Sequence, residues 1–326
     1  MKKEIRTVKD GQWLQVTTID ERWYARPKVV EATGLPESFE YVPSVTWITG
    51  FYPKGVPFYK WLAEKGWDEA EAIKNEAGDR GSKVHQAILE LLDGKPIAMG
   101  ASYINNTTRG PEELSLDEYN CLMSFVAWYE SVKKGTGFYP RVINREFVVW
   151  NDVHGYAGTI DLLCEIFNTE TQAWELWILD FKTGQYVWPN MEIQLSGYKE
   201  AFVAERPAMA SRTIRLAVLR LGYKRNKRGF ILTEVEHQFP LFLAAKEIWK
   251  KETQGVEPLQ KDYPLLLKLA PPEPAAAAQT SPSETNGAGN GDVPEAEREA
   301  LAAAEDMTSS RKPAAPRTTT KRRVAA

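Results

Sequence analysis

Two aspartates and a lysine, each at the end of a short apolar segment, are the residues of this chain best suited to chemistry. Asp161 ends the sequence Gly-Thr-Ile-Asp, and Asp180 follows 19 positions later in Leu-Asp-Phe-Lys, which ends at Lys182. Mg²⁺ prefers hard oxygen ligands, and one or two carboxylates with substrate phosphate oxygens normally suffice. A lysine beside the ion can position or activate a water molecule, or stabilise charge at phosphorus. The pattern predicts a metal-dependent nuclease site.

The elements around these residues must bring them together. The period of a β-strand places Asp180 and Lys182 on one face of a sheet and turns Phe181 to the opposite, packed face. A helix opened by a Trp-Pro pair then carries Gln194 and Tyr198, whose i,i+4 spacing puts both on one side, facing back towards the site. An Asp-x-Lys alone is usually a solvated surface pair, so the prediction depends on the order and spacing of the whole set.

The set resembles the PD-(D/E)XK nuclease superfamily. Within it, the chain is similar to the RecB-like branch, which includes phage and prophage exonucleases and the nuclease domains of bacterial recombination complexes. In that branch an upstream helix carries Gly-x-x-x-His, which Gly81 to His85 matches, and the strand before the Gly-x-x-Asp hairpin often carries a glutamate, here Glu146. A lone histidine beside an apolar stripe is more often a core residue, but this context reverses that preference. The resemblance covers residues from about 43 to 239.

The resemblance implies an α/β fold with a restriction-endonuclease-like core, a mixed central β-sheet flanked by helices, an N-terminal helical portion and a disordered C-terminal tail. It implies hydrolysis of DNA phosphodiester bonds with Mg²⁺ or Mn²⁺. The implied metal ligands are His85, Asp161, Asp180 and the carbonyl of Phe181, with Lys182 acting on the attacking water. Glu146 is a further metal ligand or a residue behind one. The implied substrate-binding residues are Gln194, Tyr198 and Arg80, with Lys83 also placed to meet phosphate.

Three functions remain open at this point. A DNA exonuclease in phage or bacterial recombination and repair fits the RecB-like features best. A structure-specific endonuclease of the same fold, cutting flaps or junctions, is the first alternative. A catalytically silent DNA-binding module is the second, although every expected catalytic residue type is present.

Composition sets further limits. The chain has 326 residues, is 43% hydrophobic and carries a net charge of -3, which neither supports nor excludes a nucleic-acid partner. Cys121 and Cys164 are the two cysteines and are expected to be buried thiols, as in a reducing cytosol. An iron–sulfur cluster would need four cysteines and is not expected. No apolar run approaches the ~18 residues of a membrane span, so we expect a cytoplasmic protein, in the host cytoplasm if phage-encoded.

Three segments are expected along the chain. Residues 1–42 form an N-terminal extension with a β-hairpin, to which no chemistry is assigned, and residues 43–268 form the nuclease domain. Residues 269–326 are rich in Ala, Pro, Ser and Thr and cannot bury enough apolar surface to fold. The last 16 residues, 311–326, contain basic residues and no acidic one. They could bind DNA or recruit a recombination or single-strand-binding protein, or act only as a solubilising tail.

Hydrophobic periodicity predicts the elements of the central segment. Ser44 is expected to cap a short helix. The apolar stripe of the third helix is expected at Tyr119, Leu122, Met123, Val126 and Tyr129. The expected helices are 58–65, 77–92, 111–134, one carrying Gln194 and Tyr198, and 241–251; the expected strands are 141–150, 156–166, 175–181, 213–221 and 229–237.

Basic residues are concentrated in and around the last expected hairpin. No acidic residue occurs between Pro207 and Thr233. Sequence-independent phosphate contact is one interpretation. A solvated turn that protects a sheet edge is the other. The basic residues concerned are Arg212, Arg215, Arg220, Lys224, Arg225, Lys227 and Arg228, the last four being the predicted substrate contacts.

Overall fold

The computed structural model describes residues 4–8, 13–17, 21–30, 36–184, 186–222 and 229–256. The chain divides into two units, Met1–Leu265 and Leu266–Ala326. The predicted tail from residue 269 lies outside the described residues, as do Lys224, Arg225, Lys227 and Arg228. The fold described below is that of the first unit.

A five-stranded sheet forms the centre of this unit. Its order is β11-β10-β9-β8-β7, in which β9 and β10 pair in parallel and all other neighbours are antiparallel. The expected mixed sheet, with the expected hairpins between β7 and β8 and between β10 and β11, is therefore present. The strands are β7 (Arg141–Asn151), β8 (Tyr156–Asn168), β9 (Ala173–Lys182), β10 (Ile214–Leu221) and β11 (Phe230–Glu234).

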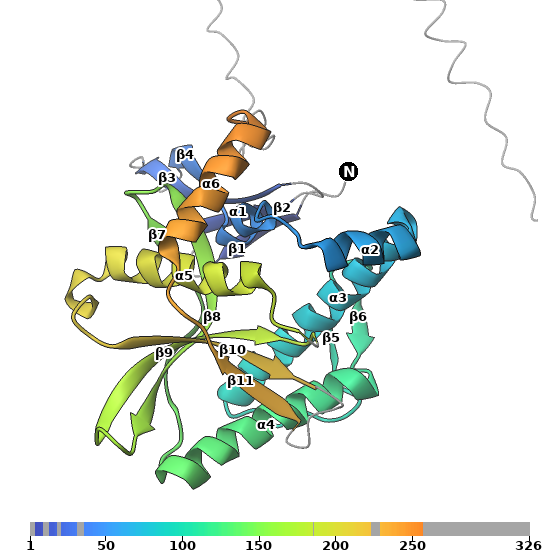
Figure 1. The fold of residues 1–326 in the computed structure, drawn as a ribbon. Coiled ribbons are helices and arrows are strands. Elements are labelled where there is room, and N and C mark those ends of the chain that lie inside the picture. The colour runs from blue at the N-terminus through green and yellow to red at the C-terminus, as the bar shows by residue number, and fades with distance from the viewer. Residues whose placement is uncertain are drawn as a thin grey trace, which may run out of the picture. The chain divides into compact units, whose positions relative to one another are not determined.

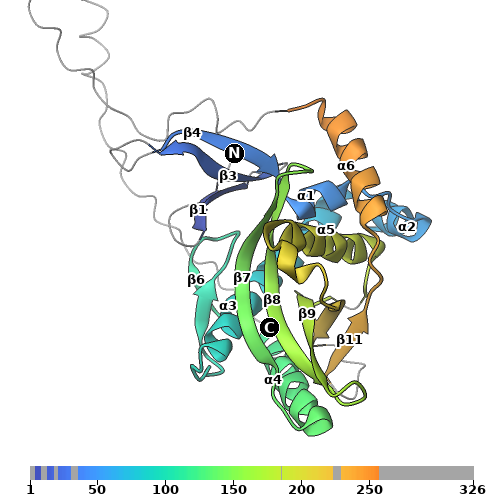
Figure 2. The same ribbon diagram turned by 90° about the vertical axis from the view of Figure 1, so that its left-hand side faces the viewer.

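Helices cover both faces of this sheet (Figures 1 and 2). On β9, Leu176 and Ile178 pack in a cluster with α1, α5 and α6, whereas Trp177 and Leu179 pack in a second cluster with α3 and α4. Burial on both faces explains why the strand is apolar almost throughout. The helices are α1 (Val45–Gly50), α2 (Val56–Lys65), α3 (Trp67–Leu92), α4 (Leu116–Thr136), α5 (Pro189–Glu205) and α6 (Phe239–Thr253), with a short 3₁₀ turn at Pro207–Met209.

The N-terminal extension is a second, antiparallel sheet rather than a single hairpin. The predicted hairpin is present as β2 and β3, and β1 and β4 extend it on either side in the order β1-β2-β3-β4. The strands are β1 (Glu4–Val8), β2 (Trp13–Thr17), β3 (Arg22–Val30) and β4 (Pro36–Pro43).

Aromatic packing joins this sheet to the helical layer. Trp47 of α1 lies 4.9 Å from the ring of Trp23 in β3 and 5.2 Å from the ring of Trp249 in α6. The hydroxyl of Ser44 accepts from the Trp47 N–H at 3.0 Å, so the predicted cap of α1 is confirmed. The cap fixes the direction in which the chain leaves the sheet for the helices.

Three predictions in the helical part are wrong. The helix expected at 77–92 is α3, which begins ten residues earlier, at Trp67. Residues Pro111–Glu113 do not begin a helix; they form β6, which pairs with β5 (Ser102–Ile104). The helix starts after Ser115, which forms a capping box with Glu118. A capping box satisfies two orphan N–H groups, so it fixes the start of α4 more strongly than the preceding proline does.

The buried side of α4 is also offset from the predicted stripe. Met123 and Val126 are 53% and 45% exposed, whereas Phe125 and Trp128 are buried against the sheet. Aromatic and aliphatic side chains surround much of this helix, so the sequence offers two apolar stripes about one residue apart. Packing against β10 and β11 selects between them.

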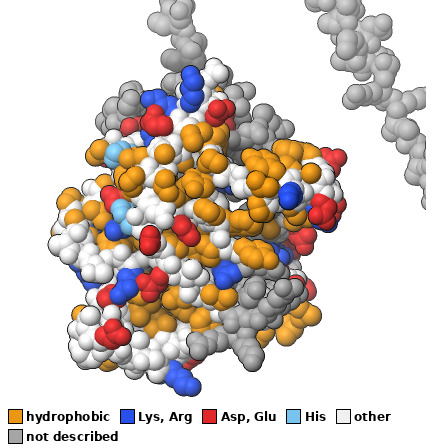
Figure 3. Space-filling model, viewed as in Figure 1, with side chains coloured by type: hydrophobic (Ala, Val, Ile, Leu, Met, Phe, Trp, Pro, Cys, Tyr) orange, Lys and Arg blue, Asp and Glu red, His pale blue; other side chains and the backbone are white. Residues whose placement is uncertain are grey.

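Helix α2 is amphipathic in sequence but contributes no side chain to the core. Val56 and Tyr59 are 65% and 57% exposed, and apolar side chains gather over this helix in Figure 3. No helix within the described ranges is long and apolar enough to cross a membrane.

Candidate metal centre

The candidate site forms where strands β8 and β9 separate. Their ladder ends with Leu162 opposite Leu179, and Asp161 and Asp180 are the next residues on the two strands. Beyond the ladder, the N–H of Phe181 donates to Oδ2 of Asp161 at 2.7 Å. The side chain of Asp161 therefore replaces a backbone partner, which fixes one of its oxygens and leaves the other to face the site.

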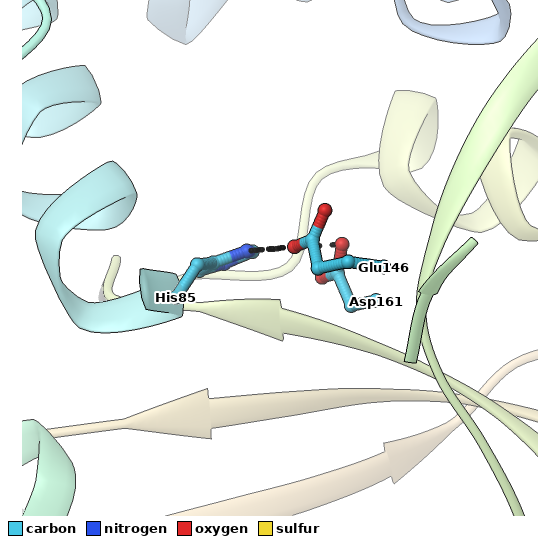
Figure 4. Close-up of side chains that lie close together, drawn as sticks. All are labelled: His85, Glu146 and Asp161. Carbon is cyan, nitrogen blue, oxygen red and sulfur yellow. Dashed lines mark hydrogen bonds and ion pairs between the residues drawn. The ribbon is translucent and has the colours of Figure 1, made fainter. Parts of the chain in front are cut away.

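A histidine and a glutamate complete a cluster around Asp161. Nδ1 of His85, on α3, lies 3.3 Å from Oε1 of Glu146 on β7 and 3.7 Å from Oδ1 of Asp161. One ligand atom from each of the three lies within 4.8 Å of the others. Figure 4 shows the three side chains pointing towards one another from a helix and the sheet. This spacing is suited to a single cation.

The backbone at Glu146 is unusual for a strand. Its φ is +42°, in the left-handed region, and the β7–β8 register shifts just before it, between Val142 and Asn144. A residue with a Cβ atom pays about 1–2 kcal/mol for this conformation. Backbone strain of this kind is often found at active sites and ligand-binding sites, where the surrounding structure holds a side chain in place.

The carbonyl of Phe181 contacts the imidazole of His85. Nε2 of His85 lies 3.2 Å from this oxygen and donates to it, while Nδ1 faces Glu146 and Asp161. When Nδ1 loses its proton, its lone pair is therefore directed at the centre of the cluster. In this arrangement the carbonyl orients the imidazole, and its predicted role as a metal ligand stays a prediction. A hydrogen bond of this kind commonly supports metal-binding histidines.

Asp180 lies beside this cluster but has protein partners for both oxygens. Nζ of Lys182 is 2.5 Å from Oδ2, and Nε2 of Gln194 donates to Oδ1 at 3.0 Å and contacts Oη of Tyr198 at 2.9 Å. The predicted face of α5 therefore looks back into the site as expected. The cluster of possible ligand atoms consists of His85, Glu146 and Asp161, and the predicted role of Asp180 as a metal ligand stays a prediction.

The glycine of the Gly-x-x-Asp motif is required by close packing. A Cβ atom on Gly158 would lie 2.4 Å from Cε1 of Tyr198 and 3.1 Å from Cγ2 of Val45. Both neighbours are buried, so neither can move away without disturbing the core. The motif glycine thus lets the ring of Tyr198 reach Gln194.

Replacing Gly158 by alanine is expected to destabilise the protein by about 1–3 kcal/mol, because the methyl group overpacks this site. Urea denaturation measures the change. Gly135→Ala is the matched control: its Cβ would meet nothing within 4 Å, in helix α4. Alanine there should be neutral or stabilising by up to ~1 kcal/mol. Equal stability of Gly158→Ala and the wild type would contradict the packing argument.

Burial and mutual charge shift the titration of the cluster. Burial raises the pKa of Asp161 to about 7, and the negative charges of Asp180 and Glu146 add to this, while His85 opposes it. Burial by itself lowers the pKa of His85, but Asp161 and Glu146 outweigh it and raise this pKa to about 9. At neutral pH the imidazole therefore carries a proton that a metal ion must displace.

Metal affinity is expected to rise with pH. Below pH ~7 a cation must displace protons from both Asp161 and His85, and from pH ~7 to ~9 only the His85 proton remains. The logarithm of the Mn²⁺ association constant should therefore rise most steeply with pH below ~7. Between pH ~7 and ~9 it should rise by up to one unit per pH unit. Above pH ~9 it should become constant. Isothermal titration calorimetry over this range measures it. A pH-independent affinity would show that these two groups do not bind the ion.

The cluster lines a cleft of about 1070 Å³ together with three of the predicted substrate-binding residues, Arg80, Gln194 and Tyr198. Arg80 lies on its wall, where its Nε donates to Oγ1 of Thr183 at 3.3 Å. Lys83 does not line the cleft. It is buried and paired with Glu118 at 3.0 Å, so the prediction that it contacts phosphate is wrong.

Two of the basic residues near β10 pair with glutamates, and four others lie outside the described residues. Arg212 pairs with Glu165 at 2.6 Å and Arg215 with Glu175 at 2.7 Å, so these two stabilise the sheet. The four basic residues assigned to substrate binding, Lys224, Arg225, Lys227 and Arg228, lie outside the described residues, and their role stays a prediction. Cys121 and Cys164 are buried free thiols, as expected.

The N-terminal sheet also reaches this cleft, which the sequence did not indicate. Gln15, Thr17, Arg22 and Tyr24 are among the lining residues. Their contact with the site depends on how two sheets pack, and no local pattern encodes that. No protein-family model and no curated protein matches this chain.

Proposed function

We propose that this chain is a Mg²⁺- or Mn²⁺-dependent DNA nuclease with a restriction-endonuclease-like core of the RecB-like kind. One observation carries the proposal: the cluster of His85, Glu146 and Asp161 adjoins the ion pair of Asp180 and Lys182 in a single cleft. A hard cation can polarise a phosphate oxygen and activate water, and an ammonium group beside it can stabilise the developing negative charge, so the two together can support phosphodiester hydrolysis.

The donor set fits the proposed ion. Two carboxylates and one imidazole are suitable for Mn²⁺, and Mg²⁺ accepts the same carboxylates while keeping several waters. His85, Glu146 and Asp161 would hold the ion, and the neighbouring carboxylate of Asp180 would add negative charge beside it. A bound ion would supply Lewis acidity and lower the pKa of a coordinated water.

Lys182 remains charged in this environment. Burial lowers its pKa, but the carboxylates of Asp180 and Asp161 outweigh burial, so the net pKa is raised. A lysine that is protonated at neutral pH cannot accept a proton from water. Its role is therefore to hold the attacking group or to neutralise the charge that develops on the phosphate oxygens.

Gln194 and Tyr198 position this cation indirectly. Gln194 donates to Asp180, and Asp180 in turn holds the ammonium of Lys182. Burial raises the pKa of Tyr198 well above its ordinary value, with Asp180 and Asp161 adding to it, so the phenol stays neutral. The pair acts as a hydrogen-bonded support rather than as an acid or base.

DNA is the proposed substrate, and an exonuclease acting in phage or bacterial recombination and repair, in the cytoplasm, is the preferred mode. End-labelled linear DNA and covalently closed circular DNA, each incubated with Mg²⁺, Mn²⁺ or EDTA, test it. Metal-dependent loss of linear DNA alone supports the exonuclease. Cutting of circles identifies an endonuclease, and binding without cleavage under any metal identifies a DNA-binding module.

A further inference from the structure

The N-terminal sheet contributes part of the lining of the cleft. Tyr24 of β3 is buried, and its hydroxyl lies 2.7 Å from Oγ1 of Thr159, two residues before Asp161 on β8. The N–H of Ser44 donates to the carbonyl of Arg22 at 2.9 Å, and Ser44 also bridges to Ala157. These contacts attach β3 to the same hairpin that carries Asp161.

Arg22 is the basic residue that this sheet places in the cleft. The Gln15 amide oxygen, oriented towards its donors, accepts from Nη2 of Arg22 at 2.9 Å and from Nε at 3.0 Å. A guanidinium group has five N–H donors, so three remain. Among the described residues, no carboxylate forms an ion pair with this side chain.

A second arginine on the same strand provides the contrast. Arg26 pairs with Glu40 at 3.0 Å and with Asp152, and its guanidinium lies 4.4 Å from the centre of the Trp150 ring. Its donors are used within the protein. Arg22, four residues earlier, is held by a neutral amide that orients the group without cancelling its charge.

Arg22 lines the same cleft as the catalytic residues. Arg22, Arg80 and Lys182 are basic residues that the N-terminal sheet, α3 and β9 respectively contribute to this lining. An oriented guanidinium without a carboxylate partner is suited to bind a phosphate group through two parallel hydrogen bonds.

We propose that Arg22 binds a backbone phosphate of the DNA substrate next to the site of hydrolysis, which makes the N-terminal sheet part of the active site. The inference rests on the proposed nuclease function and extends it to residues outside the motifs. Arg22 is a substrate-binding residue in this account. Gln15 is a positioning residue that acts through it.

The test uses the full chain, a short fluorescein-labelled oligodeoxynucleotide in EDTA, and three substitutions. Arg22→Gln should weaken binding by about 10-fold or more, the usual effect of losing a charge-assisted hydrogen-bonded contact. The slope of log K against log[salt] should also decrease in magnitude by about one, the change expected for the loss of one phosphate contact. Arg22→Lys should fall between Arg22→Gln and the wild type, and Arg26→Gln should bind as the wild type does. In cleavage assays with Mn²⁺, Arg22→Gln should raise KM more than it lowers kcat.

The outcomes separate the inference from the function beneath it. If the wild type binds and cuts DNA and Arg22→Gln does both equally well, the inference is overturned and the nuclease proposal stands. If Arg26→Gln weakens binding as much as Arg22→Gln does, the effect is general to the sheet and the inference also fails. If the wild type neither binds nor cuts DNA, the proposed function fails and the inference falls with it. Melting temperatures confirm that each variant is folded.

Discussion

Lys182→Met is expected to lower the rate of metal-dependent DNA hydrolysis by about 10²- to 10⁴-fold, the range observed when a charge-stabilising or proton-transferring group is removed. Nζ of Lys182 lies 2.5 Å from Asp180 and shares the cleft with the cluster of His85, Glu146 and Asp161. DNA binding should fall far less, because other cations of the cleft remain. A gel assay of end-labelled DNA at saturating Mn²⁺ measures the rate.

Loss of Lys182 also leaves Asp180 buried without its counter-ion. Asp180 is 2% exposed, and breaking a buried ion pair by removing one partner typically costs about 3–5 kcal/mol. The double variant Asp180→Asn/Lys182→Met removes both charges and should recover much of that stability without recovering activity. Lys65→Met, at an exposed pair with Glu69, should alter neither property. Near-normal cleavage by a folded Lys182→Met protein would exclude the assigned role.

Asp161→Asn is expected to weaken Mn²⁺ binding by at least about 100-fold. Even the loss of a residue that only hydrogen-bonds to a metal ligand typically lowers metal affinity by about 10–100-fold. The substitution keeps the shape of the site: an asparagine oxygen can still accept from the N–H of Phe181, as Oδ2 of Asp161 does at 2.7 Å. Isothermal titration calorimetry measures the affinity. Asp152→Asn, on the same β7–β8 hairpin and 67% exposed, is the control and should bind as the wild type does.

The same substitution should stabilise the metal-free protein above pH ~7. Burial raises the folded-state pKa of Asp161 to about 7, above its ordinary value of 3.8, so ionisation costs folding free energy progressively between these two values. The cost is fully present above ~7 and absent below ~3.8. Asparagine does not ionise, so Asp161→Asn should melt higher than the wild type in EDTA at pH 8. A lower melting temperature there would indicate a structural rather than a functional carboxylate.

The parts of the site that follow from local periodicity could be predicted. The shared face of Asp180 and Lys182 depends only on the two-residue period of a strand, and that of Gln194 and Tyr198 only on the helical turn. The structure places all four as expected. The grouping of His85 with Asp161 and Glu146 was implied by the resemblance and does not follow from local periodicity, because it depends on where β8 and β9 separate and on the left-handed backbone at Glu146.

The five strands were likewise predictable, since apolar segments and turns mark each of them, and the resemblance implied a mixed sheet flanked by helices. The part of the cleft lining that comes from the N-terminal sheet was not predictable. Arg22 reaches the site through the aromatic packing of Trp23 on Trp47 and through Tyr24 on Thr159, a residue 135 positions away in the chain. The prediction of the buried side of α4 was wrong for a related reason. The sequence has two apolar stripes on this helix, and tertiary contacts determine which of them is buried.

The most direct test of the nuclease proposal compares the wild type with Asp161→Asn on the same end-labelled linear DNA, with Mg²⁺, with Mn²⁺ and with EDTA. The proposal predicts hydrolysis by the wild type in either metal, none in EDTA, and loss of nearly all activity in Asp161→Asn. Hydrolysis that persists in EDTA, or that survives in the folded Asp161→Asn protein, would contradict a metal-dependent nuclease centred on this cluster.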